Sequence, residues 1–419
     1  MSCLFSDTSH YENVPFEVPE GWMWTTLGNI GIWQAGATPS RMRKDYYGGK
    51  IPWLKTGDLT DGYIYDIPET ITDKALDETS VKLNPSGSVL IAMYGATIGK
   101  VGILTCPATT NQACCACVGY KAVTQKYLFY FLLSHKEEFV KMGGGGAQPN
   151  ISKEKITATL IPIPPIAEQN RITNKVEHLI ALIESIEFNR AKLDQSIRLC
   201  KDSILDLATS GKLVTQDSSD EPALELLKRI NPSFEPCDNR HYANLPTGWQ
   251  LAKIKDVFII NPKNKVDDDI DAGFVSMAMI DDGYRDSYQF EKKKWALIKN
   301  GFTHFKDGDI AVAKISPCLE NRKSMILKNL PNGIGAGTTE LHIFRSAIVD
   351  PKFALYFFKS DHFINQCVGT FNGVVGQQRV GKNIIEDIMF PLPPYKEQRR
   401  ISERITQIFM YLDKITAEL

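Results

Sequence analysis

Apolar residues recur at alternating steps of four and three along residues 172–207. Arg190 and Cys200 are the two exceptions, and every other step falls on Ile, Leu or Val. This heptad pattern predicts an α-helix that buries one stripe of side chains against a second helix. A helix from Glu168 to Ser210 would be about 64 Å long, at about 1.5 Å per residue. The predicted stripe begins with Ile172, Val176, Leu179, Ile183 and Ile186.

The same steps recur near the end of the chain, where the stripe comprises Ile401, Ile405, Ile408, Leu412 and Ile415. Each of these residues follows its counterpart in the first stripe by 229 positions. We expect the two stripes to pack on each other in antiparallel helices, with Ile183 and Ile186 against residues 401–419. A coiled coil with another protein is the alternative.

The rest of the chain is duplicated too. Segment 162–172, PIPPIAEQNRI, recurs as segment 391–401, PLPPYKEQRRI, at an offset of 229. Two Thr-Thr pairs, at 109–110 and 338–339, share this offset, and the VPEGW opening at 18–22 recurs as LPTGW at 245–249. The chain is therefore two copies of one unit, each a globular block, a Pro-rich hinge and a helix.

Short apolar runs bounded by Gly or polar residues predict strands in both blocks, and two longer apolar runs predict helices. Strands are expected at 88–93, 309–313 and 342–344, and helices at 127–133 and 353–358. The predicted fold class is α+β: two mostly-β domains separated by two long antiparallel coiled-coil helices, in a pseudo-two-fold internal duplication. In order, the predicted regions are an N-terminal segment (1–17), a first block (18–165), a central helix (166–214), a linker with a short helix at 222–230 (215–244), a second block (245–394) and a shorter second helix (395–419).

Composition and charge are those of an ordinary globular protein, with 43% hydrophobic residues, 23% charged residues and a net charge of -1. The first block carries 14 basic and 12 acidic residues and the second 19 and 17, so each has a net charge of +2. No apolar run approaches the roughly 18 residues of a membrane span, and the start lacks a secretory pattern. With nine scattered cysteines read as reduced thiols, we expect a cytoplasmic protein that contacts no membrane.

Nucleotide-binding and catalytic motifs are missing from the sequence. The glycine segment 95–100 is one residue short of a phosphate-binding loop. Cys114 and Cys117 have Cys-x-x-Cys spacing, but the second copy offers Ile343 and Ser346 there, which favours small core residues over a zinc or redox pair. We therefore expect no catalytic residue and no metal ligand in this chain.

Polar loops shared by both blocks are the candidate binding elements. Loop 38–50 is basic, aromatic and Gly-containing, which suits contact with phosphates and base edges, although a merely solvated loop is the alternative. Loop 143–150 and its counterpart 372–379 carry Gln, Asn and Arg, which read adenine and guanine edges. The predicted DNA contacts are Thr38, Ser40, Arg41, Arg43, Lys44, Tyr46, Lys55, Tyr94, Lys100, Asn111, Gln148 and Asn150 in the first block, and Lys263, Lys265, Lys314, Arg322, Lys323, Gln377, Gln378 and Arg379 in the second.

Taken together, these features resemble the specificity subunit of type I restriction-modification systems. Segment 36–40, leading to 47–53 and 55–59, is similar to a common opening of that family's target recognition domain. Segments 277–279, 301–309 and 313–321 resemble another variant of the same domain. The hinge followed by Glu-Gln-x-Arg-Ile resembles the family's entry into its spacer helix.

The resemblance implies that each block reads one part of a split target in double-stranded DNA, while the helices dock two methylation subunits. It implies no chemistry or cofactor in this chain: S-adenosylmethionine would serve the methylation subunits, and ATP and Mg²⁺ the restriction (nuclease-motor) subunits. Two alternatives remain open at this point. One is an enzyme with unrecognised catalytic residues, and the other is a scaffold that only oligomerises through its helices.

Overall fold

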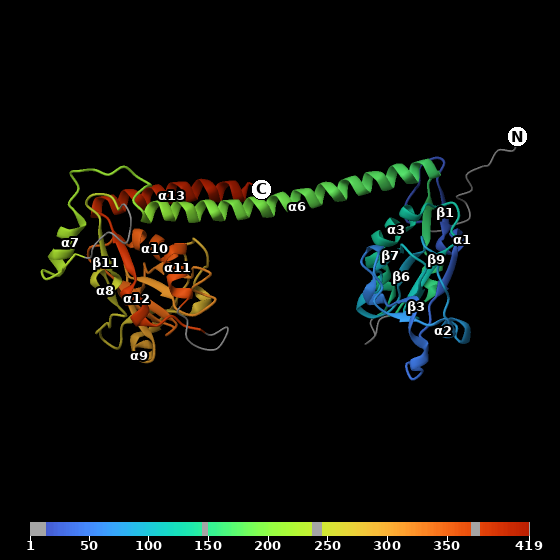
Figure 1. The fold of residues 1–419 in the computed structure, drawn as a ribbon, viewed down its shortest axis with the longest axis horizontal. Coiled ribbons are helices and arrows are strands. Elements are labelled where there is room, and N and C mark those ends of the chain that lie inside the picture. Colours follow the sequence, from blue (N-terminus) through green and yellow to red (C-terminus); the bar gives the residue numbers. More distant parts are fainter. Residues whose placement is uncertain (1–13, 145–149, 237–244, 370–377, 419) are drawn as a thin grey trace. The chain divides into compact units, whose positions relative to one another are not determined.

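The computed structural model describes residues 14–144, 150–236, 245–369 and 378–418. The chain divides into two compact units, residues 1–186 (unit 1) and residues 187–419 (unit 2), and the boundary falls inside the long helix α6 (Ile166–Thr209). Each unit contains one mostly-β block (Figure 1). Among the described residues, no helix is both long and apolar enough to cross a membrane.

Three sheets form the first block. A five-stranded sheet has the order β2 (Ile32–Ala35), β9 (Cys114–Val118), β6 (Val89–Ala92), β7 (Val101–Leu104) and β4 (Gly62–Ile64). A three-stranded sheet has the order β5 (Thr70–Ile71), β3 (Tyr47–Leu54) and β8 (Thr109–Thr110), and β1 (Met23–Thr26) pairs with β10 (Leu160–Ile163). The helices are α1 (Leu27–Ile30), α2 (Asp73–Glu78), α3 (Gln125–Ser134), α4 (Lys136–Met142) and α5 (Lys153–Ala158).

The second block repeats this plan. Its sheets have the orders β12 (Ile259–Ile260), β19 (Leu341–Arg345), β16 (Ile310–Ala313), β17 (Ser324–Ile326), and β14 (Glu291–Lys294), β13 (Asp271–Val275), β18 (Ile334–Gly337), β15 (Thr303–Lys306). Strand β11 (Gln250–Lys253) pairs with β20 (Met389–Leu392) as β1 does with β10. The helices of unit 2 are α7 (Ala223–Ile230), α8 (Ile254–Val257), α9 (Trp295–Ile298), α10 (Pro351–Lys359), α11 (Asp361–Val368), α12 (Lys382–Asp387) and α13 (Tyr395–Ala417), besides the end of α6.

The order β2-β9-β6-β7 recurs as β12-β19-β16-β17, and the parallel pair β3 with β8 recurs as β13 with β18, which confirms the internal duplication although the edge strands differ. The expected strands and helices lie where the apolar runs predict them. The interpretation of the cysteines is confirmed as well. Cys114 and Cys117 lie on the central strand β9 with fully buried side chains, and burial raises the pKa of the Cys117 thiol to about 12. They are therefore unreactive core residues of the five-stranded sheet.

At the Thr-Thr pairs, the offset between the two copies in the structure differs by two residues from the offset inferred from the sequence. The backbone N–H of Asn111 donates to the Leu54 carbonyl (2.9 Å), and that of Thr338 donates to the Val275 carbonyl (3.0 Å), each directly after the same pair of parallel strands. Asn111 is thus equivalent to Thr338, at an offset of 227. The offset of 229 inferred from the Thr-Thr pairs is wrong, because the register is fixed by ladder hydrogen bonds rather than by residue type.

A buried glutamine at each hinge holds the start of a helix to its block. The side-chain amide of Gln169 donates to the carbonyls of Ala122 and Pro164, both at 2.8 Å, and accepts from the Thr124 N–H at 2.7 Å. In unit 2, Gln398 donates to Ile348 (3.3 Å) and Pro393 (2.9 Å) and accepts from Asp350 (2.7 Å). Both glutamines are fully buried, so the Gln of the repeated Glu-Gln motif has a structural role at the hinge.

In unit 2, α13 runs antiparallel to the last turns of α6 (Figure 1). Lys201 pairs with Asp413, and further along Gln216 bonds Glu397 (2.7 Å), so the two segments run in opposite directions. The apolar contact belongs to one core cluster, whose members from these helices are Leu205, Ala208, Ile401, Ile405 and Phe409. The predicted antiparallel helix pair is therefore present.

Its register differs from the expected one. Ala417 lies four residues after Asp413 and so falls level with Ile197, four residues before Lys201, because the helices are antiparallel. The predicted packing of Ile183 and Ile186 against residues 401–419 is wrong: these side chains are 55% and 58% exposed. Of the other predicted stripe residues, Leu179 and Ile415 are exposed, Ile408 and Leu412 are half-buried, and Ile172 and Val176 are half-buried in unit 1.

The helix pairing gives a matched test. We expect Ile405→Ala to lower the free energy of unfolding of unit 2 by about 2–5 kcal/mol, because a fully buried Ile leaves a cavity. Ile183→Ala, on the exposed face of α6, should change stability by less than about 0.5 kcal/mol. Calorimetry of the full chain measures both variants, and an equal loss for the two would contradict this register.

The hinge glutamine gives a second test. Gln398→Leu should lower the free energy of unfolding by at least about 2 kcal/mol, because it leaves one buried N–H and two buried carbonyls without their hydrogen-bond partner. Gln407, on an exposed position of the same helix, provides the control Gln407→Leu, which should be nearly neutral. Urea denaturation compares the variants. Equal midpoints for both would mean that the hinge amide is dispensable.

Candidate nucleic-acid interface

The predicted binding loops of each block meet at one isolated β-bridge. In the first block Tyr94 bridges Asn150, and the Ile151 N–H donates to the Met93 carbonyl at 2.9 Å. In the second block Ile315 bridges Arg379, and the Val380 N–H donates to the Lys314 carbonyl at 2.9 Å. The bridge arises because the buried central strands β6 and β16 end one residue before Met93 and Lys314.

The two bridges therefore form equivalent backbone frames with different side chains. Met93, Tyr94 and Asn150 in one block correspond to Lys314, Ile315 and Arg379 in the other. Tyr94 is 38% exposed, and Asn150 and Arg379 are exposed as well. The predicted contacts Gln148 and Gln377 lie outside the described residues.

Arg379 forms a bidentate ion pair with Glu340. Its Nε and one terminal nitrogen donate to the two carboxylate oxygens at 2.7 and 2.9 Å. These bonds hold the pKa of Glu340 below its usual range. The pair presents both donors and an acceptor, and its carboxylate repels phosphate, so it suits a base edge better than a backbone phosphate. Sequence reasoning missed Glu340, since only the fold brings it beside Arg379.

The basic loop of the first block is partly neutralised from within. Arg41 bonds both carboxylate oxygens of Glu69 and lies 4.4 Å from the Tyr47 ring centroid. Arg43 donates to both oxygens of Asp45, at 2.9 and 2.7 Å. Both arginines remain about half exposed. Their ion pairs orient the guanidinium groups but lower the net positive charge that the loop offers.

Other predicted residues of this block differ in accessibility. Lys55 also pairs with Glu69 (2.9 Å), and the Arg41 bonds lower the pKa of that carboxyl to about 2. Lys44 is exposed, and no ion pair of it is found in the described part of the chain. Thr38 donates to Gln112 at the surface, and Ser40 is exposed. Asn111 is half-buried.

Tyr46 is a correction to the predicted set. Its ring is buried in a small cluster that contains Trp53 and Ile71, and its hydroxyl donates to Glu78 at 2.9 Å. Tyr46 ends a short helical turn directly before β3, and its ring packs in the same cluster as Trp53 of that strand, so Tyr46 supports the loop and does not face a ligand.

Lys100 and Lys323 are equivalent residues with an internal role. The backbone carbonyl of Lys100 accepts from the N–H of Ala92, the last residue of β6, and that of Lys323 accepts from the N–H of Ala313, the last residue of β16. The Lys323 ammonium donates to the Ile280 carbonyl (2.8 Å), and that of Lys100 lies 3.5 Å from the Leu59 carbonyl. The Lys323 side chain is half-buried and its ammonium is held by backbone carbonyls, so its role as a DNA contact stays a prediction.

Arg322 is the clearest correction. Its side chain is only 5% exposed, and it donates to the Lys359 carbonyl (2.9 Å), to Asp202 (2.7 Å) and to Asp361. A buried guanidinium with these partners does not reach a phosphate. Of the remaining predicted residues in the second block, Lys263 and Lys265 are exposed, whereas Lys314 and Gln378 are half-buried.

Comparisons with known proteins place the chain in a family. A family model described as "Type I restriction modification DNA specificity domain" matches residues 19–195 and again 246–419. The chain is 41% identical over 238 residues to the EcoAI type I restriction enzyme specificity subunit of Escherichia coli, which covers 52% of this chain and 40% of that protein. The match thus spans less than half of that relative's length. The EcoKI specificity subunit of Escherichia coli K12 is 21% identical over 418 residues, which cover 96% of this chain and 85% of the relative.

Solved structures show the same fold at low sequence identity. The HsdS subunit from Thermoanaerobacter tengcongensis matches with a TM-score of 0.57 and 17% identity, over 96% of this chain and 93% of that one. A chain from a study described as "Structural basis underlying complex assembly and conformational transition of the type I R-M system" matches with a TM-score of 0.64 and 17% identity, over 96% and 94%.

Proposed function

Because the chain belongs to the family of type I restriction modification DNA specificity domains, we propose that it reads a bipartite target in double-stranded DNA, one half-site for each block. One observation carries the proposal. The two blocks present equivalent bridges, yet Tyr94 and Asn150 stand where the second block has Ile315 and Arg379. Equal frames with unlike side chains suit two different half-sites, because base identity is read by side-chain donors and acceptors.

The proposal extends to the partners. The chain directs adenine methylation and restriction but performs neither, and two methylation subunits and the restriction subunits supply the chemistry with S-adenosylmethionine, ATP and Mg²⁺. Support comes from the relatives, which are named as specificity subunits of type I restriction enzymes. Such a complex works on DNA in the cytoplasm.

The decisive experiment maps methylated adenines in cells that contain the chain and its methylation partner. The proposal expects one split motif, and the lone chain should show neither methyltransferase nor nuclease activity. A scaffold would leave no motif and would retain no DNA selectively in a gel shift. An enzyme with unrecognised residues would be active alone. Either result would overturn the proposal.

Block exchange tests the division of labour. Replacing residues 18–161 with the equivalent block of another specificity subunit should change only the first half-site, since the junction precedes the hinge at Pro162. The separation between the half-sites should stay the same, because helix α6 is unchanged. Methylation mapping of the chimera beside the parent measures both quantities. A change in both half-sites would contradict recognition by separate blocks.

Salt dependence separates phosphate contacts from base contacts. Removing Arg41, Arg43 and Lys44 together should weaken binding to all sequences and flatten the salt dependence, because each phosphate contact contributes about 0.9 to the slope of log K against log salt. A slope change near 1 would assign the effect to Lys44, since the two arginines already pair with carboxylates. Lys175→Ala, on the exposed surface of α6, is the control and should leave the slope unchanged.

The same binding assay tests the base contacts. Arg379→Gln or Gln377→Ala should alter the preference at one half-site and leave the salt slope nearly unchanged, because guanidinium and amide groups read base edges. An unchanged half-site preference in both variants would remove these two residues from the recognition set.

A further inference from the structure

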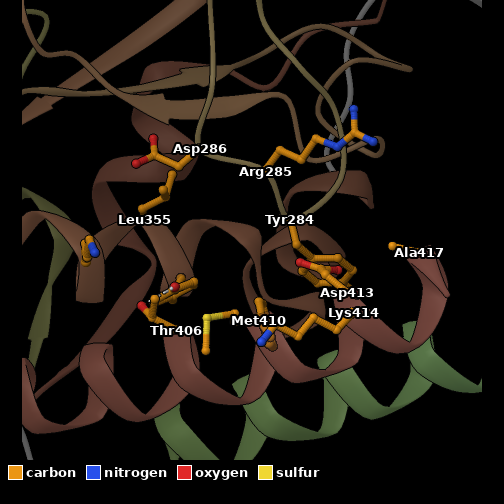
Figure 2. A pocket seen from close by; sticks show the side chains of 12 residues that line it. Tyr284, Arg285, Asp286, Leu355, Thr406, Met410, Asp413, Lys414 and Ala417 are labelled. Carbon is orange, nitrogen blue, oxygen red and sulfur yellow. Dashed lines mark hydrogen bonds between the residues drawn. The ribbon is translucent and has the colours of Figure 1, made fainter.

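A buried network joins the second block to α6 within unit 2. Tyr284 projects from the segment before β14 toward α13, beside the cavity drawn in Figure 2. Its ring packs edge-on against Phe409, with centroids 5.4 Å apart, and its hydroxyl donates to Asp202 of α6. Arg322 bonds the same carboxylate, and its guanidinium carbon lies 4.9 Å from the Tyr284 ring centroid.

A second buried cation completes the network. Lys359 is fully buried at the end of α10, and its ammonium donates to the carbonyls of Gly283 and Arg322, both at 2.8 Å. Burial lowers the pKa of Lys359 to about 7. Two buried cations are costly to desolvate, and apolar side chains of similar size would stabilise such a site as well or better. Stability alone therefore does not account for them.

The backbone of Arg322 carries a further cost. Its φ is +58°, in the left-handed region that side chains other than Gly rarely adopt. The equivalent residue of the first block, one position before Lys100, is Gly99 with a φ of +76°. The second block thus has an arginine at a position where the first block has glycine, which adopts this conformation without strain. Backbone strain of this kind is concentrated at functional sites.

Arg322 also ends a short, tightly bonded segment that begins at the candidate interface. At one end the Ser316 N–H donates to the Gln378 carbonyl (2.9 Å), next to Arg379. At the other the Asn321 N–H donates to Pro317 (2.9 Å) and the Arg322 N–H to Leu319 (2.8 Å). These bonds restrict the conformation of segment 314–322, which connects the candidate interface to the contact with α6.

We propose that Arg322, Tyr284 and Asp202 are positioning residues that fix the interface of the second block against α6, so that discrimination at the second half-site depends on this contact. None of the three touches DNA; they act through segment 314–322 on Lys314 and Arg379. The inference rests on the proposed function. It also predicts asymmetry, since Gly99 gives the first block no such link.

The test uses the full chain with its methylation subunit and a pool of random-sequence DNA duplexes, selected by binding and then sequenced. The half of the enriched motif that survives replacement of residues 18–161 belongs to the second block. Tyr284→Phe removes the hydroxyl that donates to Asp202 and lies 3.4 Å from the Arg198 carbonyl, both on α6. Asp202→Asn removes the negative charge that pairs with Arg322. Tyr356→Phe is the matched control, because its hydroxyl bonds Thr406 on α13 and not α6.

Both test variants should lose about tenfold in enrichment at the second half-site, the loss expected when one base contact is misplaced. Enrichment at the first half-site should match wild type, and Tyr356→Phe should preserve both. Melting curves select a temperature at which every variant is folded. Full discrimination at the second half-site in both folded test variants would overturn the positioning role, and so would an equal loss at the two half-sites. Absence of any motif with the wild-type chain would instead refute the proposed function.

Discussion

The attachment of each long helix to its block depends on one buried amide. Gln169 and Gln398 each satisfy two carbonyls and one N–H that would otherwise be stranded where the Pro-rich hinge meets the helix. Proline carries no N–H of its own, so the hinge cannot complete these bonds by backbone pairing. The side chain does so instead, and the direction in which the helix leaves the block follows from its geometry.

From that attachment the rest of unit 2 follows. Once α13 leaves the hinge, Ile401, Ile405 and Phe409 enter the block core together with Leu205 of α6. The pair of helices α6 and α13 therefore belongs to the hydrophobic core of the second block as much as it forms a coiled coil. This explains why α13 contacts the last turns of α6. The apolar side chains of α13 pack against α6 and against the core of the second block at once, so the block sets the register of the helix pair.

The candidate interface combines repetition with divergence. Backbone bonds at the two bridges are the same, which places comparable loops at the ends of β6 and β16. The side chains differ in kind: an amide and a phenol in one block, a guanidinium held by a carboxylate in the other. Charge is largely balanced within each block, as at Arg41 with Glu69. Directional hydrogen bonding, more than overall charge, therefore distinguishes these surfaces.

The sequence by itself determined the duplication, the helices, the central strands and the hinges, because periodic apolar positions and a repeated Pro-rich motif are local signals. Only the tertiary structure decided which polar residues are available. From the sequence, Arg322 and Tyr46 were expected at the surface. In the structure both are buried and bond partners that are distant in the sequence: Arg322 bonds Asp202, and Tyr46 bonds Glu78. Glu340 gained its place beside Arg379 in the same way, and the helix register was set by packing that no heptad count contains. Periodicity reports which face is apolar, whereas the partner of a polar group is fixed by long-range contacts that a linear pattern does not record.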